Sequence, residues 1–209
     1  MNLQWLVQAS SPNCPVYITD VKTPGNPATI VGFHSLNRVT PMSTRLDLSK
    51  LTLMDAIDLA ALIELEACRR YQQFAEELGS RGGDDPGSVF QSMAVNENKH
   101  CEQLAERRLA LFGDKPATVK IDDVFDVEAP DASAPSWNMS ARAAYYVALS
   151  SEKKAFAFYD EALHHVTQPD VKAMFEELRD EEAEHVAMLE EIIARLPPSA
   201  AVGIEDEDA

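Results

Sequence analysis

The chain has 209 residues, of which 45% are hydrophobic and 25% are charged, as in an average soluble globular domain. Thirty-five acidic residues against 18 basic ones give a net charge of −17, which disfavours nucleic acid and anionic membranes as partners. No run reaches the roughly 18 apolar residues that span a bilayer, and the first ten residues lack the pattern of a secretory signal.

The cysteines are few and far apart. Cys14, Cys68 and Cys101 do not form the pattern of a disulfide framework, so a cytoplasmic location is expected. Three cysteines are also one fewer than a four-thiolate iron or zinc site requires.

Residues 1–50 are interpreted as an N-terminal extension, rich in Pro, Thr and Asn. Two short β-prone runs, 16–18 and 29–31, could form a small hairpin or lack regular structure. Alternatively, Met42 is the natural start of the protein. His34 lies in this region and receives no role.

From Thr52 onward the pattern is helical. Thr52 and Asp55 resemble a capping box, and an apolar stripe with helical spacing predicts a helix that ends at Gly79. After a glycine-rich loop, Asp85 followed by Pro86 predicts the start of a second helix, which should reach about Phe112.

The remaining segments complete a bundle. Residues 114–138 contain three prolines and are interpreted as a long crossover. Ser140 is the expected cap of a third helix that reaches about Val166, and Pro169 begins a fourth helix that ends before Pro197. The sequence therefore predicts an all-α, ferritin-like four-helix bundle over 51–197, with one long crossover between helices 2 and 3 and an acidic tail at 198–209.

The two helix pairs repeat each other. The first and third helices contain Glu-x-x-Ala-x-x-x-Tyr, starting at Glu64 and Glu152, which are 88 residues apart. The second and fourth contain Glu-x-x-His, starting at Glu97 and Glu182, which are 85 residues apart. In an α-helix, residues three apart share a face, so each Glu-x-x-His points a carboxylate and an imidazole in one direction.

All four glutamates fall where the pattern requires apolar residues; Glu97, for example, lies four residues after Met93 and seven before Leu104. Four uncompensated buried carboxylates would cost several kcal/mol each, whereas two divalent cations would neutralise them. Oxygen and nitrogen ligands favour iron, with manganese as an alternative. The predicted ligands are Glu64, Glu97, His100, Glu152, Glu182 and His185.

Neighbouring residues of the same types receive other interpretations. Glu161 and His164 form a third Glu-x-x-His, but Glu161 lies nine residues after Glu152, about half a turn around the helix, and should face solvent. Glu181 is left outside the site, although it lies four residues before His185.

Tyr71 and Tyr159, which recur in both halves, are either core residues or hydrogen-bonding partners that orient the ligands. Cys68 and Cys101 are interpreted as small buried hydrophobes.

Both Glu-x-x-Ala-x-x-x-Tyr segments and both Glu-x-x-His segments make the chain from about Thr52 to Leu196 resemble a rubrerythrin-type member of the ferritin-like family. The resemblance implies a di-iron centre that cycles between Fe²⁺ and Fe³⁺ while reducing peroxide. Two features depart from it. No paired Cys-x-x-Cys rubredoxin module is present, so a separate protein must donate electrons, and Ala155 stands where rubrerythrins place an extra glutamate. The expected site therefore has six ligands and is symmetric.

The expected function is a di-iron oxidoreductase that reduces hydrogen peroxide or O₂, assembled as a homodimer. One alternative is a ferroxidase or iron-storage protein, for which storage would require a hollow cage. Another is a bundle without metal that serves in protein interactions.

Overall fold

The computed structural model describes residues 46–79, 85–120, 127–136 and 138–201, and these contain helices but no strand. The helices are η1 (Leu48–Lys50), α1 (Leu53–Leu78), α2 (Pro86–Phe112), α3 (Ala141–Ala162), α4 (Pro169–Arg195) and η3 (Pro198–Ala201). The predicted all-α four-helix bundle is thus confirmed. The β-prone runs near the N-terminus and the end of the acidic tail lie outside the described residues. No helix in the described ranges is long and apolar enough to cross a membrane.

Local side-chain chemistry explains where the helices begin. The Thr52 hydroxyl accepts a hydrogen bond from the Asp55 N–H at 3.2 Å, and the Asp55 carboxylate accepts one from the Thr52 N–H at 3.1 Å. This is the capping box that the sequence predicts. Asp85 and Ser140 cap α2 and α3 more simply: each side-chain oxygen accepts a hydrogen bond from the backbone N–H three residues later, without the reciprocal bond of a capping box.

Helix α3 ends at Ala162, four residues earlier than the predicted end at Val166. The chain reverses direction between Ala162 and Pro169, and Gln168 has the extended backbone that a proline favours in the residue that precedes it. Val166 is instead a buried residue of the turn that joins α3 to α4.

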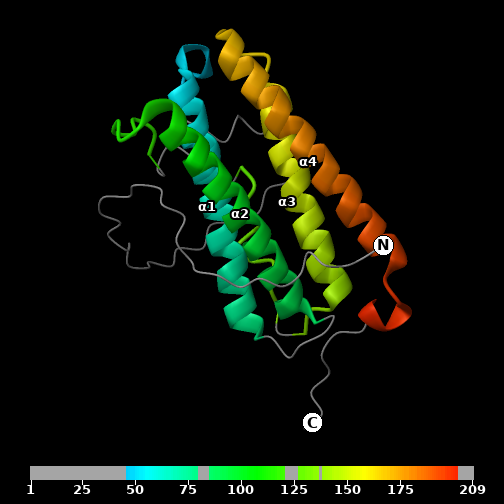
Figure 1. Cartoon of the computed structure of the whole chain (residues 1–209). Coiled ribbons are helices and arrows are strands. Elements are labelled where there is room, and N and C mark those ends of the chain that lie inside the picture. Colours follow the sequence, from blue (N-terminus) through cyan, green and yellow to red (C-terminus); the bar gives the residue numbers. More distant parts are fainter. Residues whose placement is uncertain (1–45, 80–84, 121–126, 137, 202–209) are drawn as a thin grey trace, which may run out of the picture.

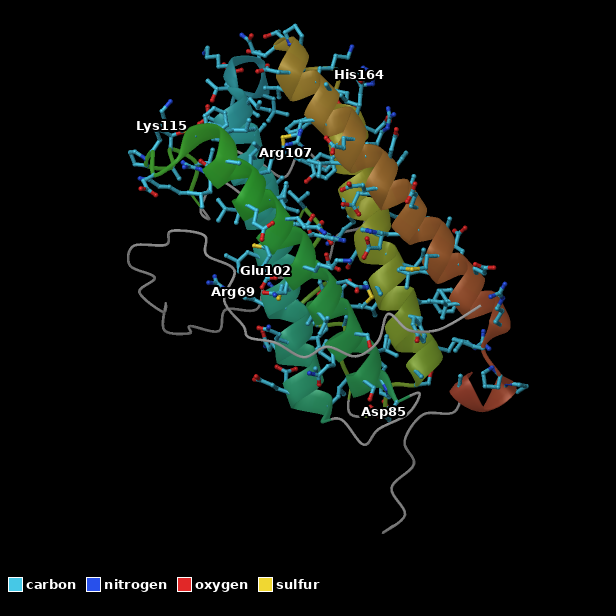
Figure 2. All side chains as sticks on the ribbon, in the orientation of Figure 1. Arg69, Asp85, Glu102, Arg107, Lys115 and His164 are labelled. Atoms are coloured by element: carbon cyan, nitrogen blue, oxygen red, sulfur yellow. The ribbon has the colours of Figure 1, made fainter. Side chains whose placement is uncertain are left out.

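The four helices form two antiparallel pairs joined by the crossover. Helix α1 packs mainly on α2 and α3 mainly on α4, and α2 also contacts α3 while α1 contacts α4. Figure 1 shows that α2 ends at one end of the bundle and α3 begins at the other, and Figure 2 places Asp85 and Lys115 at opposite ends of α2. The connection therefore covers the length of α2, about 40 Å for 27 residues.

The start of the crossover is fixed to the bundle by Arg108. Its guanidinium forms a buried ion pair with Asp58 at 2.9 Å and donates hydrogen bonds to the carbonyl oxygens of Gly113, at 2.7 Å, and Lys115. One side chain thus satisfies two carbonyls that follow the end of α2.

The hydrophobic core consists of two clusters. One includes Ile57, Tyr159 and Phe175 and fills the end of the bundle where α1 begins. The other includes Tyr71 and Phe90 and fills the opposite end. Buried carboxylates from all four helices lie at intermediate positions in the sequence of each helix, so a polar layer separates the clusters.

The N-terminal approach to the bundle also packs against it. Leu48 in η1 is buried in the first cluster, and the Ser49 carbonyl oxygen accepts a hydrogen bond from the Thr167 hydroxyl at 2.8 Å. Packing therefore begins a few residues before the boundary at residue 51 that the sequence suggested.

The close approach of α1 and α2 at Gly87 generates a prediction. A Cβ atom at Gly87 would lie 2.1 Å from the carbonyl oxygen of Gly79, a backbone atom that cannot move independently. We expect Gly87→Ala to lower the free energy of unfolding by about 1–3 kcal/mol, the usual cost of overpacking. Chemical denaturation measures this change. Helix propensity alone favours Ala by about 0.5–1 kcal/mol, so a stabilised variant would contradict the close packing.

Candidate metal centre

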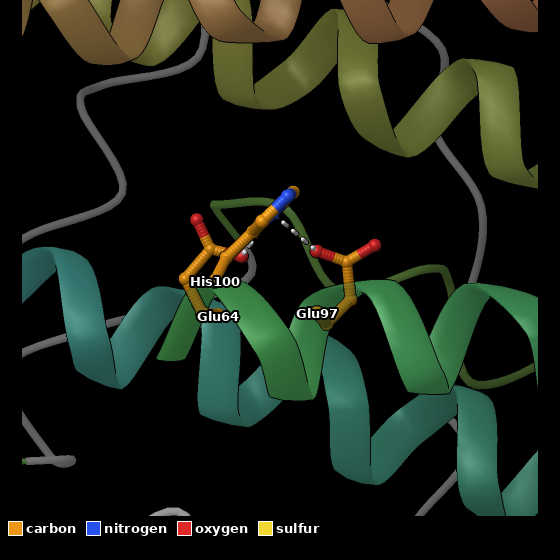
Figure 3. Close-up of side chains that lie close together, drawn as sticks. All are labelled: Glu64, Glu97 and His100. Atoms are coloured by element: carbon orange, nitrogen blue, oxygen red, sulfur yellow. Dashed lines mark ion pairs between the residues drawn. The ribbon is translucent and has the colours of Figure 1, made fainter. Parts of the chain in front are cut away.

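The first half of the site joins α1 to α2. Glu64 extends from α1, and Glu97 and His100 extend from one face of α2, three residues apart. His100 Nδ1 lies 3.6 Å from Glu64 Oε2 and 3.8 Å from Glu97 Oε2. Figure 3 shows the imidazole between the two carboxylates and pointing away from its own helix pair toward α3 and α4.

The second half repeats this arrangement between α3 and α4. His185 Nδ1 lies 3.1 Å from Glu152 Oε2 and 3.3 Å from Glu182 Oε2. In both halves, ligand atoms of the two carboxylates and the histidine lie within 4.8 Å of one another. The structure thus brings the six side chains singled out from the sequence together as two matching triads.

The two triads face each other across the bundle. The His100 and His185 rings are stacked, with centroids 4.8 Å apart and planes within 1° of parallel. Their side chains are 23% and 24% exposed, whereas none of the four carboxylate side chains exceeds 3%. The histidines therefore form the solvent-facing side of the site, and the carboxylates form its interior.

A fifth carboxylate, which sequence reasoning missed, belongs to the same cluster. Glu128 comes from the crossover and is only 1% exposed. Its ligand atoms lie within 4.8 Å of Glu64 and Glu182 on one side, and within 4.8 Å of Glu97 and Glu152 on the other. The predicted six-residue set therefore leaves out one buried carboxylate of this cluster. The crossover has no helical periodicity, so the local pattern carries no signal that would distinguish Glu128 from a solvated residue.

The buried carboxylates are poorly compensated within the described part of the protein. At least one oxygen of each has no hydrogen-bond partner, and neither oxygen of Glu128 has one. Burial raises the pKa of Glu97, Glu128 and Glu182 well above the ordinary value, and the neighbouring carboxylates raise it further. Such a cluster requires either protons or cations, because an isolated buried charge costs several kcal/mol.

The same carboxylates stabilise the charged form of His185. Burial opposes its protonation, but hydrogen bonds to Glu152 and Glu182 outweigh burial and raise its pKa to about 10. Without a metal, the imidazolium therefore supplies positive charge to the second triad. A metal ion bound through the same nitrogen would replace that proton.

The donor set fits a pair of hard or borderline divalent ions. Two imidazole nitrogens and five carboxylates suit iron or manganese better than metals that prefer sulfur. A Glu from each of two helices and a Glu-x-x-His from each of the other two is the ligand set of di-iron and di-manganese carboxylate bundles. The residues present therefore fit such a centre.

Tyr71 and Tyr159 lie in the core next to this layer. Both are completely buried, and burial followed by nearby carboxylates raises the pKa of each hydroxyl well above the ordinary value. The nearby Ser151 hydroxyl donates to the Val147 carbonyl oxygen at 3.3 Å, and among the described residues neither tyrosine hydroxyl has a hydrogen-bond partner. Both hydroxyls thus stay protonated. Whether they orient ligands remains a prediction.

The structure separates other residues from the site. Glu161 is exposed and pairs with His165 at 3.1 Å rather than with His164. Glu181 is exposed and belongs to none of the carboxylate clusters.

Cys68 and Cys101 are both buried. The Cys68 thiol donates to the Ala94 carbonyl oxygen at 3.4 Å, and burial raises its pKa to about 11, so it is not a reactive thiolate. His34 and Cys14 lie outside the described residues.

Comparison with known proteins agrees with this geometry. A family model described as Rubrerythrin matches residues 55–193, and matches again over 144–208. An uncharacterized conserved protein from Magnetospirillum magnetotacticum MS-1, known from its crystal structure, is 26% identical with a TM-score of 0.54, over 70% of this chain and 97% of that one.

Rhodobacter capsulatus bacterioferritin, described with a metal-free dinuclear site and haem iron, is 20% identical with a TM-score of 0.47, over 75% of this chain and 96% of that one. Among curated proteins, none matches this chain significantly.

The two triads predict which variants lose metal. We expect Glu97→Ala or Glu182→Ala to weaken metal binding at least about tenfold, because each removes a buried ligand from one triad. Glu161→Ala is the matched control, since its carboxylate belongs to an otherwise identical Glu-x-x-His motif but faces solvent. Metal content after dialysis, measured by elemental analysis, checks the result. Equal loss in all three variants would refute the assignment.

The shifted pKa values predict how pH affects the metal-free protein. Glu97, Glu128 and Glu182 have folded pKa values above the ordinary 4.5, and His185 is raised from 6.5 to about 10. Groups with raised folded pKa values bind more protons in the folded state, so their stabilisation is present at low pH and is lost as pH rises.

We therefore expect the metal-free protein to become less stable, and its melting temperature to fall, as pH rises from about 5 to 10. The free energy of unfolding should decrease by about 1.4 kcal/mol per pH unit for each extra proton that the folded state holds. Saturating Mn²⁺ should flatten this dependence, because the cations replace the protons. A metal-free protein whose melting temperature rises over this range would contradict the inferred burial of these carboxylates.

Proposed function

Because this chain belongs to the rubrerythrin family, we propose that it is a di-iron oxidoreductase that reduces hydrogen peroxide and receives its electrons from a separate protein. The observation that carries this proposal is the pair of matching Glu, Glu, His triads buried between two apolar clusters. The six side chains that would hold the metals are Glu64, Glu97, His100, Glu152, Glu182 and His185.

When bound, a pair of ferrous ions would supply the two electrons that, with two protons, convert one hydrogen peroxide molecule into two of water. The four helices hold one triad opposite the other, and the apolar clusters on both sides limit the access of water to the interior. A small, uncharged molecule such as hydrogen peroxide suits this site better than a large substrate.

Access to the site is proposed to run past the histidines. His100 and His185 are about a quarter exposed, whereas the carboxylates behind them are almost completely covered. The hydroxyls of Tyr71 and Tyr159 lie in the covered core without a partner among the described residues, and we propose that they donate hydrogen bonds to the carboxylates when the metals are bound.

The separate electron donor follows from the cysteine count. These 209 residues contain three cysteines, so their own side chains cannot build a four-thiolate iron site. The chain can therefore deliver only the two electrons that its metal pair holds, and a second turnover needs an external reductant.

We predict that the reduced, iron-loaded protein reacts faster with hydrogen peroxide than with O₂. Anaerobic stopped-flow mixing should consume about one peroxide per pair of irons and then stop, and added electron donor should restore turnover. Glu161→Ala should behave like the unaltered protein, and Glu97→Ala should lose most of the reaction.

Faster oxidation by O₂, together with repeated turnover sustained by excess Fe²⁺ alone, would instead indicate a ferroxidase. A native mass corresponding to a hollow cage would further favour iron storage, whereas a dimer would argue against it.

A further inference from the structure

The crossover approaches the site at one buried segment, residues 127–130, which we call the strap. Val127 and Ala129 are 2% and 0% exposed, and Val127 packs into the first apolar cluster. Glu128 lies between them, with both carboxylate oxygens buried and without a hydrogen-bond partner. A carboxylate this deeply covered and unpartnered requires either a proton or a cation close to it.

The strap is held in place by one basic side chain from each helix pair. Lys154 on α3 donates a hydrogen bond from Nζ to the Ala129 carbonyl oxygen at 2.7 Å. Arg70 on α1 donates from its guanidinium to the Pro130 carbonyl oxygen at 3.3 Å. Both contacts reach the two residues directly after Glu128, so they fix the backbone that carries it.

We propose that Glu128 is a fifth, bridging carboxylate of the metal centre, and that Lys154 and Arg70 are positioning residues that hold it there. The bridging role rests on the placement of Glu128. Its ligand atoms lie within 4.8 Å of two pairs of carboxylates, Glu64 with Glu182 and Glu97 with Glu152, and each pair contains one residue from each triad. This inference depends on the proposed metal centre and adds to it the source and the support of one further ligand.

Neither basic residue contacts the six candidate ligands through a described hydrogen bond, so the two act on the centre through the strap. Each also has a neighbour that serves as a control. Arg69 extends from α1 away from the bundle (Figure 2), and Lys153 pairs with Glu190 on α4 at 2.8 Å. Among the described residues, neither Arg69 nor Lys153 donates a hydrogen bond to the strap.

The test uses the full chain and Mn²⁺ alone as the probe. Binding stoichiometry and affinity come from titration, and electron paramagnetic resonance of the loaded protein reports the exchange coupling that bridging ligands transmit between two Mn²⁺ ions. The unaltered protein should bind two Mn²⁺ per chain as a coupled pair. We expect Glu128→Gln to weaken binding of at least one ion by about tenfold or more and to change the coupling.

The positioning role predicts a graded result. Arg70→Met combined with Lys154→Met should weaken binding by about tenfold and shift the coupling in the same direction as Glu128→Gln, and Lys154→Arg should retain both properties. The control combination of Arg69→Met with Lys153→Met should leave both unchanged. Thermal unfolding of each metal-free variant checks folding, and Glu128→Gln is not expected to destabilise the metal-free protein because it removes a buried charge.

The outcomes separate the two proposals. If the unaltered protein fails to bind two Mn²⁺ ions, the metal centre itself is wrong. If it binds them and Glu128→Gln leaves affinity and coupling unchanged, the bridging role is overturned while the six-ligand centre stands. If Glu128→Gln changes affinity and coupling but the combined Arg70→Met and Lys154→Met variant does not, Glu128 is a ligand that these two residues do not position.

Discussion

The structure depends on one electrostatic constraint, which is the burial of five carboxylates in a single layer at the middle of the bundle. A typical domain is stable by only about 5–15 kcal/mol, and one uncompensated buried charge costs several kcal/mol. The layer can therefore exist only when protons or cations neutralise it. The two apolar clusters on either side supply the packing that keeps the helices together around it, and their separation gives the layer its place in the fold.

The two helix pairs show how much of this site the sequence could reveal. Helical periodicity is a local property, so the coincidence of Glu97 and Glu182 with apolar positions could be read without knowing the tertiary fold. The caps at Thr52 and Asp85 set the start of two helices through hydrogen bonds spanning three residues, which are equally local. The internal repeat then indicated that both pairs build the same half-site, and the structure brings those halves together.

Features that depend on tertiary contacts were beyond such reasoning. Glu128 lies in a segment without periodicity, and the two residues that follow it are held by side chains from helices that are distant in the sequence. Arg70 and Lys154 are of residue types that usually lie on the solvated face of a helix. Only the path of the crossover gives them a different environment from Arg69 and Lys153. The early end of α3 likewise reflects how the chain turns into α4 rather than the helix propensity of residues 163–166.

The internal repeat does not account for the odd number of buried carboxylates. The two matching helix pairs contribute their carboxylates in matching pairs, and the fifth comes from the crossover, an element that occurs once. Ala155, fully buried one turn after Glu152, contributes no charge of its own. Five carboxylates around two divalent ions leave a net charge of −1, and around two trivalent ions +1, whereas four would leave 0 and +2. Because the cost of burying charge grows steeply with its magnitude, the fifth carboxylate would keep the buried charge of the proposed di-iron centre within one unit of neutrality in both oxidation states.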